Sequence, residues 1–186
     1  MAAHEVSSRG GSQVMPLGRI AVNYGLLFID GRETVPEFRD LPEYFGDRHP
    51  NWILGESHGR ILLNLGTHTG SVEVTLIAGE PPAVDHAVEG IEDDVTISVP
   101  AASDGYWVAV NSDGTDLRES TSLPDAPEGW YRLTLRARGR AEAMRQPVPE
   151  PGTEKVDLYV RPAPQAPDAV DRQVSGLKQR LVPDDG

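Results

Sequence analysis

The sequence predicts an all-β protein: an antiparallel β-sandwich of about eight strands with one long aromatic-rich loop and a proline-rich C-terminal tail. Three observations lead to this prediction. Segments in which apolar and polar residues alternate recur along the chain, and a period of two is typical of strands with one buried face. Turn residues separate these segments at short intervals. Glycine (19) and proline (16) together make 35 of the 186 residues, above the usual share of roughly 12%.

The clearest strands lie within Gly129–Arg161. Residues 130–138 and 155–160 both alternate, so we expect an antiparallel pair with one apolar face on the core and one charged face in water. The connection Gly139–Thr153 contains Pro147, Pro149, Pro151 and Gly152, which predicts a long hairpin connection without a further element.

Basic residues form a stripe along this stretch, and we expect them to make cross-strand ion pairs with Asp157 or Glu154 rather than to bind phosphate. The stripe consists of Arg132, Arg136, Arg138 and Arg140.

The N-terminal part begins with residues 1–16, which are polar and rich in serine and glycine. We expect a flexible lead there, because no apolar stretch of a signal peptide is present. Gly18–Asp30 then alternates as a first strand or strand pair, which Gly25 interrupts and the turn dipeptide Asp30-Gly31 ends.

Further strands are expected in four segments before the C-terminal pair, and they complete a β-domain over residues 17–161. The segments are Gly59–Leu65, Ser71–Ala78, Asp94–Val99 and Tyr106–Val110.

The loop Glu33–Ser57 is irregular and holds four of the eleven aromatic residues. Asp40 is placed to cap a single helical turn that has Pro42 near its start. Two interpretations stay open: the loop is a lid, with Phe38, Phe45 and Trp52 over one end of the core, or it is a binding site, since long loops in compact domains are often functional.

The C-terminal segment, residues 162–186, changes character. The proline-rich run Arg161–Pro167 predicts an extended linker. Asp168 is expected to cap a short amphipathic helix. The apolar face of that helix would consist of Val170, Val174, Leu177 and Leu181.

The net charge of −12 is concentrated in one region. Glu80–Glu128 contains twelve acidic residues and a single basic one, Arg118, which gives −11. This charge opposes direct binding to nucleic acid or to an anionic membrane, and it favours a basic protein as partner. The alternative is an acidic surface that only keeps the domain soluble. The residues that we expect to contact the partner are Asp85, Glu89, Glu92, Asp93 and Asp94.

The motifs of most enzyme classes are absent from the sequence. With no cysteine, thiolate catalysis and cysteine-based metal sites are excluded. The five histidines lack metal-ligand spacing, no nucleophile elbow or phosphate-binding loop occurs, and Asn111–Asp116 has the composition of a turn rather than of a calcium loop. We therefore expect a binding protein rather than an enzyme, with no catalytic residue, metal or cofactor.

No run of 18 apolar residues is present, so we expect no membrane span and a cytoplasmic protein. A second candidate function is a β-sandwich module that binds a small molecule or carbohydrate through aromatic side chains. The residues expected to bind such a ligand are Phe38, Tyr44, Trp52 and Trp107.

Two segments also carry a resemblance. Val22–Asp30 has a tyrosine before an apolar run, and the strand Gly129–Arg140 precedes the last strand, Leu158–Pro164. Together they resemble small acidic actinobacterial proteins without an established function, and more distantly the competence-linked nuclease inhibitor family. The resemblance implies a small β-rich protein that binds and blocks a DNA-entry nuclease, and it implies no particular functional residue.

Overall fold

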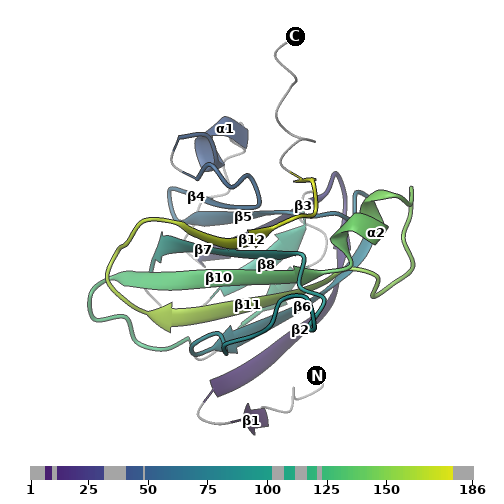
Figure 1. Cartoon of the computed structure of the whole chain (residues 1–186). Helices are drawn as coiled ribbons and strands as arrows, with labels where there is room; N and C mark the ends of the chain where they lie inside the picture. The colour runs from purple at the N-terminus through teal and green to yellow at the C-terminus, as the bar shows by residue number, and fades with distance from the viewer. Residues whose placement is uncertain are drawn as a thin grey trace.

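A computed structural model of the chain describes residues 7–9, 12–31, 41–47, 49–101, 107–111, 117–120 and 123–177. These residues form twelve strands and two short helices (Figure 1). The strands are β1 (Ser7–Arg9), β2 (Ser12–Val22), β3 (Leu26–Gly31), β4 (Leu54–Ser57), β5 (Arg60–Asn64), β6 (Gly70–Ala78), β7 (Asp93–Pro100), β8 (Trp107–Asn111), β9 (Leu117–Glu119), β10 (Trp130–Arg138), β11 (Lys155–Pro162) and β12 (Ala169–Gln173). The helices are α1 (Leu41–Tyr44) and α2 (Arg140–Met144).

The all-β prediction is confirmed. Each of the seven segments expected to form strands does so, and Gly18–Asp30 contributes to two strands, β2 and β3. β10 and β11 pair antiparallel over eight residues, with Leu133 opposite Val160 and Ala137 opposite Val156. The break expected at Gly25 is the turn between β2 and β3, where Gly25 has a φ of 70°.

The strands form two sheets. The larger has the order β1-β2-β6-β11-β10-β7-β12, and the smaller has the order β4-β5-β3-β8-β9. Neighbouring strands are antiparallel except β11 and β6, which are parallel, so the entirely antiparallel arrangement that we expected is wrong at this point. β11 enters the sheet between β6 and β10, and its direction is set by its antiparallel partner β10.

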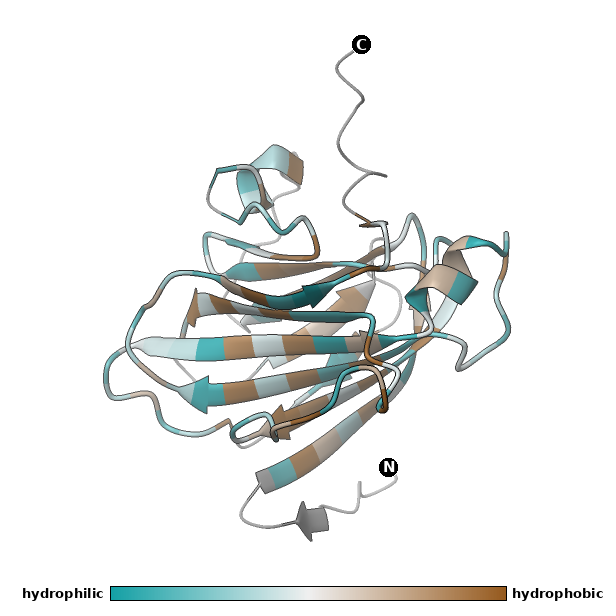
Figure 2. Cartoon of the chain, viewed as in Figure 1, coloured by the Kyte–Doolittle hydropathy of each residue, from teal (hydrophilic) through white to brown (hydrophobic). Residues whose placement is uncertain are grey.

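One apolar cluster joins the two sheets. It includes Ile20, Val72 and Leu133 of the larger sheet and Leu27 and Ile61 of the smaller one, all buried. Figure 2 shows the alternating bands of apolar and polar residues along β10 and β11 that place one face of the sheet on this core.

The outer face of β10 is also covered, so the water-facing charged face that we expected on this strand is wrong. Arg132, Thr134 and Arg136 are buried there. Arg136 Nη1 donates a hydrogen bond to the Pro82 carbonyl oxygen (2.7 Å), and Arg132 Nη1 donates one to the Ala166 carbonyl oxygen (2.8 Å). The β6–β7 and β11–β12 connections therefore lie over this face and bind it through its arginines.

Two parts of the flexible lead expected over residues 1–16 lie in strands: residues 7–9 form β1, and β2 begins at Ser12. Pro16 is tolerated because the register shifts between Pro16 and Gly18, a β-bulge where a missing N–H does least harm.

The helix expected after Asp168 is also wrong over residues 169–173, which form β12 along the free edge of β7. Gly176 weakens a helix there, while strand pairing satisfies the backbone and lets Leu177 enter the core, where it is buried. Val170 and Val174 stay exposed. Leu181 lies outside the described residues.

Two connections contain short helices. The single helical turn expected near Pro42 is α1, and its expected cap, Asp40, lies outside the described residues. The Gly139–Thr153 connection contains α2, contrary to our expectation of no further element. α2 lies at one end of the sheets (Figure 1). No helix in the described part of the chain is long and apolar enough to cross a membrane.

Candidate functional site

Two of the expected partner-binding acids face the interior. Asp93 and Asp94 are 0% and 1% exposed, so neither presents its charge to a partner, and for these two residues our expectation of a surface role is wrong. Glu92 is half-buried, and its carboxylate accepts hydrogen bonds from the backbone N–H groups of Gly139 (3.1 Å) and Ala141 (2.7 Å) at the start of α2. These three acids organise the fold.

Asp93 belongs to a buried triad with Arg140 and Glu154, all three 0% exposed in their side chains. Arg140 Nη1 lies 3.0 Å from Asp93 Oδ2, and Arg140 Nε lies 3.0 Å from Glu154 Oε1. Glu154 also accepts hydrogen bonds from the N–H groups of Gly66 (3.1 Å) and Thr67 (2.7 Å). The triad thus joins β7, α2 and the β5–β6 turn.

Asp93 extends the same network to the C-terminal segment. Its Oδ1 accepts hydrogen bonds from the N–H groups of Val174 (3.1 Å) and Ser175 (3.2 Å). The end of β12 is therefore held by a buried carboxylate in addition to its ladder with β7.

Asp94 holds the β6–β7 connection in place. Its Oδ2 lies 2.8 Å from His86 Nε2 and 2.9 Å from Arg136 Nε. Asp94 thus holds the connection at His86, and Arg136 holds it at the Pro82 carbonyl.

The exposed part of the β6–β7 connection carries the other two expected acids, Asp85 and Glu89. Asp85 Oδ1 accepts hydrogen bonds from the N–H groups of Ala87 (3.0 Å) and Val88 (3.3 Å), which orders the turn. Val88, between the two acids, is 81% exposed. The loop therefore presents two carboxylates and one apolar side chain outward.

The basic stripe makes the expected contacts in two cases. Arg138 Nη1 lies 2.7 Å from Asp157 Oδ2, and Arg140 pairs with Glu154. Arg136 instead pairs with Asp94 on β7.

Of the aromatic residues expected to bind a ligand, the three that the structure describes do not form one open site. Trp107 is buried in the core, where its ring meets Tyr131 edge-on with centroids 5.6 Å apart. Tyr44 is buried against Phe28, and Trp52, half-buried, stacks on Phe45 at 5.4 Å. Phe45 and Trp52 thus pack with Phe28 and Leu62 in a second cluster, separate from the main core. Phe38 lies outside the described residues.

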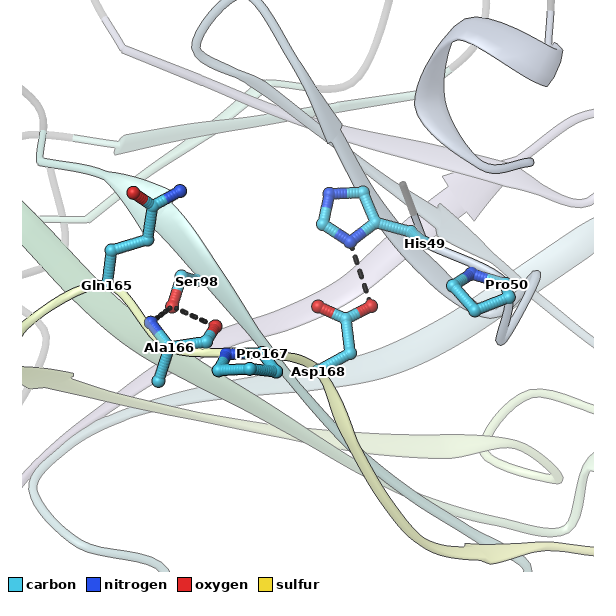
Figure 3. Close-up of a pocket in the computed structure, with 7 residues that line it drawn as sticks. All are labelled: His49, Pro50, Ser98, Gln165, Ala166, Pro167 and Asp168. Atoms are coloured by element: carbon cyan, nitrogen blue, oxygen red, sulfur yellow. Dashed lines mark hydrogen bonds and ion pairs between the residues drawn. The ribbon is translucent and has the colours of Figure 1, made fainter. Parts of the chain in front are cut away.

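A pocket of about 590 Å³ lies beside the outer face of β7 (Figure 3). It is lined by His49, Pro50, Ser98, Gln165, Ala166, Pro167 and Asp168. His49 Nδ1 lies 2.9 Å from Asp168 Oδ2, which also accepts a hydrogen bond from Asn51 Nδ2 (3.3 Å). Figure 3 shows the second carboxylate oxygen of Asp168 pointing away from His49.

The serine, histidine and aspartate of this pocket do not form a catalytic triad. Ser98 Oγ donates its proton to the Ala166 carbonyl (3.0 Å) and accepts hydrogen bonds from the Ala166 N–H (2.9 Å) and Arg132 Nη1 (3.0 Å). A hydroxyl held in this way is not activated by a neighbouring base. Burial lowers the pKa of Arg132, and the nearby charge of Asp168 partly offsets the effect. The serine and the arginine thus fix the β11–β12 connection.

The described residues include no group of three or more histidine, aspartate or glutamate side chains arranged to hold a metal ion. The pocket had no signal in the sequence, because His49 and Asp168 are 119 residues apart. The lone acid after a proline run suggested a helix cap instead.

Comparison with solved structures shows a likeness in fold. ComJ, the inhibitor of the DNA-degrading activity of NucA from Bacillus subtilis, aligns with a TM-score of 0.56 at 12% sequence identity, over 81% of this chain and 98% of ComJ. The protein of crocagin biosynthetic gene J aligns with a TM-score of 0.48 at 17% identity, over 80% of this chain and 97% of its own. No protein-family model and no curated protein sequence matches the chain.

Proposed function

We propose that this chain is an inhibitor-type binding protein whose partner is a positively charged protein of the nuclease class. The observation that carries the proposal is the alignment with the nuclease inhibitor ComJ over 98% of that protein's length. One fold supports many functions, so the likeness in fold needs a second line of support, and the surface charge provides it.

The positive charge proposed for the partner follows from the acidic residues that lie at the surface of this chain. Asp85 and Glu89 are exposed on the β6–β7 loop, and Glu128 is exposed before β10. All three belong to the region that carries −11 of the net charge of −12. Such a field speeds the association of an oppositely charged protein and contributes more to rate and specificity than to affinity.

The rigid attachment of the loop supports a binding role. His86 and Pro82 are held by Asp94 and Arg136, so Asp85, Val88 and Glu89 start from a fixed backbone. A preorganised loop loses less conformational entropy on binding than a mobile one.

The test uses the full chain, immobilised and exposed to a lysate of the organism that encodes it. Proteins that the wild-type chain retains are eluted with salt. Each eluted protein is then assayed for DNA cleavage in the presence and absence of the wild-type chain. The charge reversal D85K/E89K is compared with D47K, which reverses an exposed charge beside α1.

We expect a basic nuclease that wild type and D47K retain and inhibit, and that D85K/E89K releases at lower salt. Retention of no basic protein, or a nuclease whose activity the chain leaves unchanged, would refute the proposal. A cytoplasmic location stays a prediction, which cell fractionation would test.

The pocket at His49 and Asp168 favours a second candidate, a small-molecule or carbohydrate-binding module, because its volume lies in the range of roughly 300–1,000 Å³ typical of ligand sites. Trp52, beside Asn51, is a suitable fluorescent reporter. A ligand of this pocket would change the tryptophan emission of wild type and not that of D168N, and a screen of metabolites and glycans without such a change would count against this candidate.

A further inference from the structure

We infer that the end of the molecule around Tyr24 is the surface that contacts the partner protein, with the Tyr24 ring as its anchor. This inference rests on the proposed function and names the binding face. The surface, called here the Tyr24 end, comprises the β2–β3 turn at residues 23–25, the β5–β6 turn at residues 65–69, and the β10–β11 connection at residues 139–154.

Tyr24 is an exposed aromatic residue at the tip of the β2–β3 hairpin. Its side chain is 74% exposed, and its φ of 61° places a non-glycine residue in the left-handed region. Together with Gly25, whose φ is 70°, it forms the two-residue turn between the bridged residues Asn23 and Leu26, a hairpin turn that requires a positive φ at both central residues. The ring meets the exposed His68 edge-on, with centroids 6.0 Å apart. A large aromatic side chain is thus held outward at the tip of a tight hairpin.

Hydrogen bonds to the neighbouring turn fix the position of Tyr24. The Gly25 N–H donates to the His68 carbonyl (2.9 Å), and the Leu65 N–H donates to the Gly25 carbonyl (2.8 Å). A Cβ atom at Gly25 would lie 3.3 Å from the Leu65 carbonyl oxygen, so the two turns approach closely. The β2–β3 turn therefore moves with the β5–β6 turn.

The β5–β6 turn is itself held in place by the buried triad of Asp93, Arg140 and Glu154. Glu154 accepts the N–H groups of Gly66 and Thr67 and pairs with Arg140. The Gly66 backbone passes so near α2 that a Cβ atom there would lie 2.7 Å from the Arg140 carbonyl oxygen. Buried ion pairs contribute little net stability, and fixing one conformation is their best-attested role. At the Tyr24 end, the triad fixes how the β2–β3 turn, the β5–β6 turn and the β10–β11 connection lie against one another.

The third loop adds apolar surface beside the two turns. A Cβ atom at Gly70 would lie 3.6 Å from Pro149 Cδ, which places this part of the connection against the start of β6. Val148, next to Pro149, is 66% exposed. Tyr24, His68 and Val148 thus project from three adjacent loops.

Most charges near this surface are paired, and Glu150 of the β10–β11 connection adds one exposed carboxylate. Glu142 pairs with Arg145 on α2, and Lys155 lies 3.6 Å from Glu73. A centre rich in aromatic side chains and poor in net charge is typical of protein interfaces, where tyrosine is enriched among the residues that contribute most. The projecting side chains fit an apolar recess on a protein partner, and the acidic β6–β7 loop would attract the same partner by its charge.

The experiment measures binding of the partner that wild type captures to the full-length variants Tyr24→Gly and Val170→Ala. Glycine removes the ring and suits the left-handed backbone, so Tyr24→Gly should keep or raise the thermal midpoint. Val170→Ala trims an exposed apolar side chain on β12 as the control. We expect the dissociation constant to rise about 30-fold or more for Tyr24→Gly, as for hot-spot residues, and to stay unchanged for Val170→Ala.

Hydrogen exchange gives a second readout. In the complex, the amides of residues 23–25 and 65–69 should be protected in wild type. Equal affinity of Tyr24→Gly and wild type, or protection confined to the β6–β7 loop, would overturn this inference while leaving the proposed function intact. Capture of no partner by wild type would overturn both.

Discussion

Replacing Arg140 by methionine should destabilise the protein strongly, because it leaves Asp93 and Glu154 without their cation. All three side chains are 0% exposed, and the guanidinium lies 3.0 Å from each carboxylate. Removing one partner of a buried pair costs about 3–5 kcal/mol. For a domain of this size, each kcal/mol lowers the melting temperature by roughly 2–4 °C, so we expect a fall of about 6–20 °C.

The assay is thermal unfolding followed by circular dichroism, with the urea midpoint as a second measure. The matched control is R145M, which removes an arginine from the exposed pair with Glu142 and should leave the midpoint unchanged. The triple variant R140M/D93N/E154Q should recover part of the loss, because no buried charge remains. An R140M midpoint within about 3 °C of wild type would refute the reasoning, since on the scale above it corresponds to roughly 1 kcal/mol.

Three further results are expected. L177A should cost about 2–5 kcal/mol, as a large-to-small change in the core, and should speed hydrogen exchange across residues 169–175; slow exchange there would contradict the role of Leu177 in holding β12. Burial raises the pKa of Tyr131 and Tyr159, so above about pH 10 the unfolded chain loses these protons first. Stability should therefore fall with rising pH, and Y131F/Y159F should flatten urea midpoints measured from pH 9 to 11. G55A brings a methyl group into contact with the Tyr44 carbonyl oxygen and should lower the free energy of unfolding by about 1–3 kcal/mol, measured by urea titration. An unchanged midpoint would show that α1 shifts to accommodate the methyl group without loss of stability.

The strands that could be predicted are the interior ones. All eight lie between two neighbours in the sheets, and the four that were missed, β1, β4, β9 and β12, are the four sheet edges. β9 shows why: its three residues are all exposed, so no apolar alternation marks them. An edge strand forms because a neighbour offers unpaired backbone groups, and that neighbour is not visible in the local sequence.

The acids show a second limit. The sequence revealed where negative charge is concentrated but did not separate exposed acids from paired ones. Asp93 and Asp94 pair with arginines 47 and 42 residues away. The register of β10 against β7 places Arg136 opposite Asp94, and Arg140 follows β10 at the start of α2. Alternation on β10 was read correctly for the inner face and wrongly for the outer one, because connections that cover a polar face leave no periodic signal.

The candidate sites had weaker signals still. The resemblance to the competence-linked nuclease inhibitor family agrees with the fold of ComJ, as a distant likeness. Tyr24 was noted only as the residue before an apolar run. The position of its turn is fixed by hydrogen bonds of Gly25 with His68 and Leu65, contacts between segments about 40 residues apart in sequence that no local pattern reveals.

The salt dependence of association tests the central claim, recognition of a positively charged protein, most directly. The association rate constant of the full chain with its captured partner should be measured by stopped flow between low and physiological salt. We predict a rate that falls steeply as salt rises, and a shallower dependence for D85K/E89K than for D47K. A rate that is independent of salt, or equal slopes for the two variants, would contradict the account.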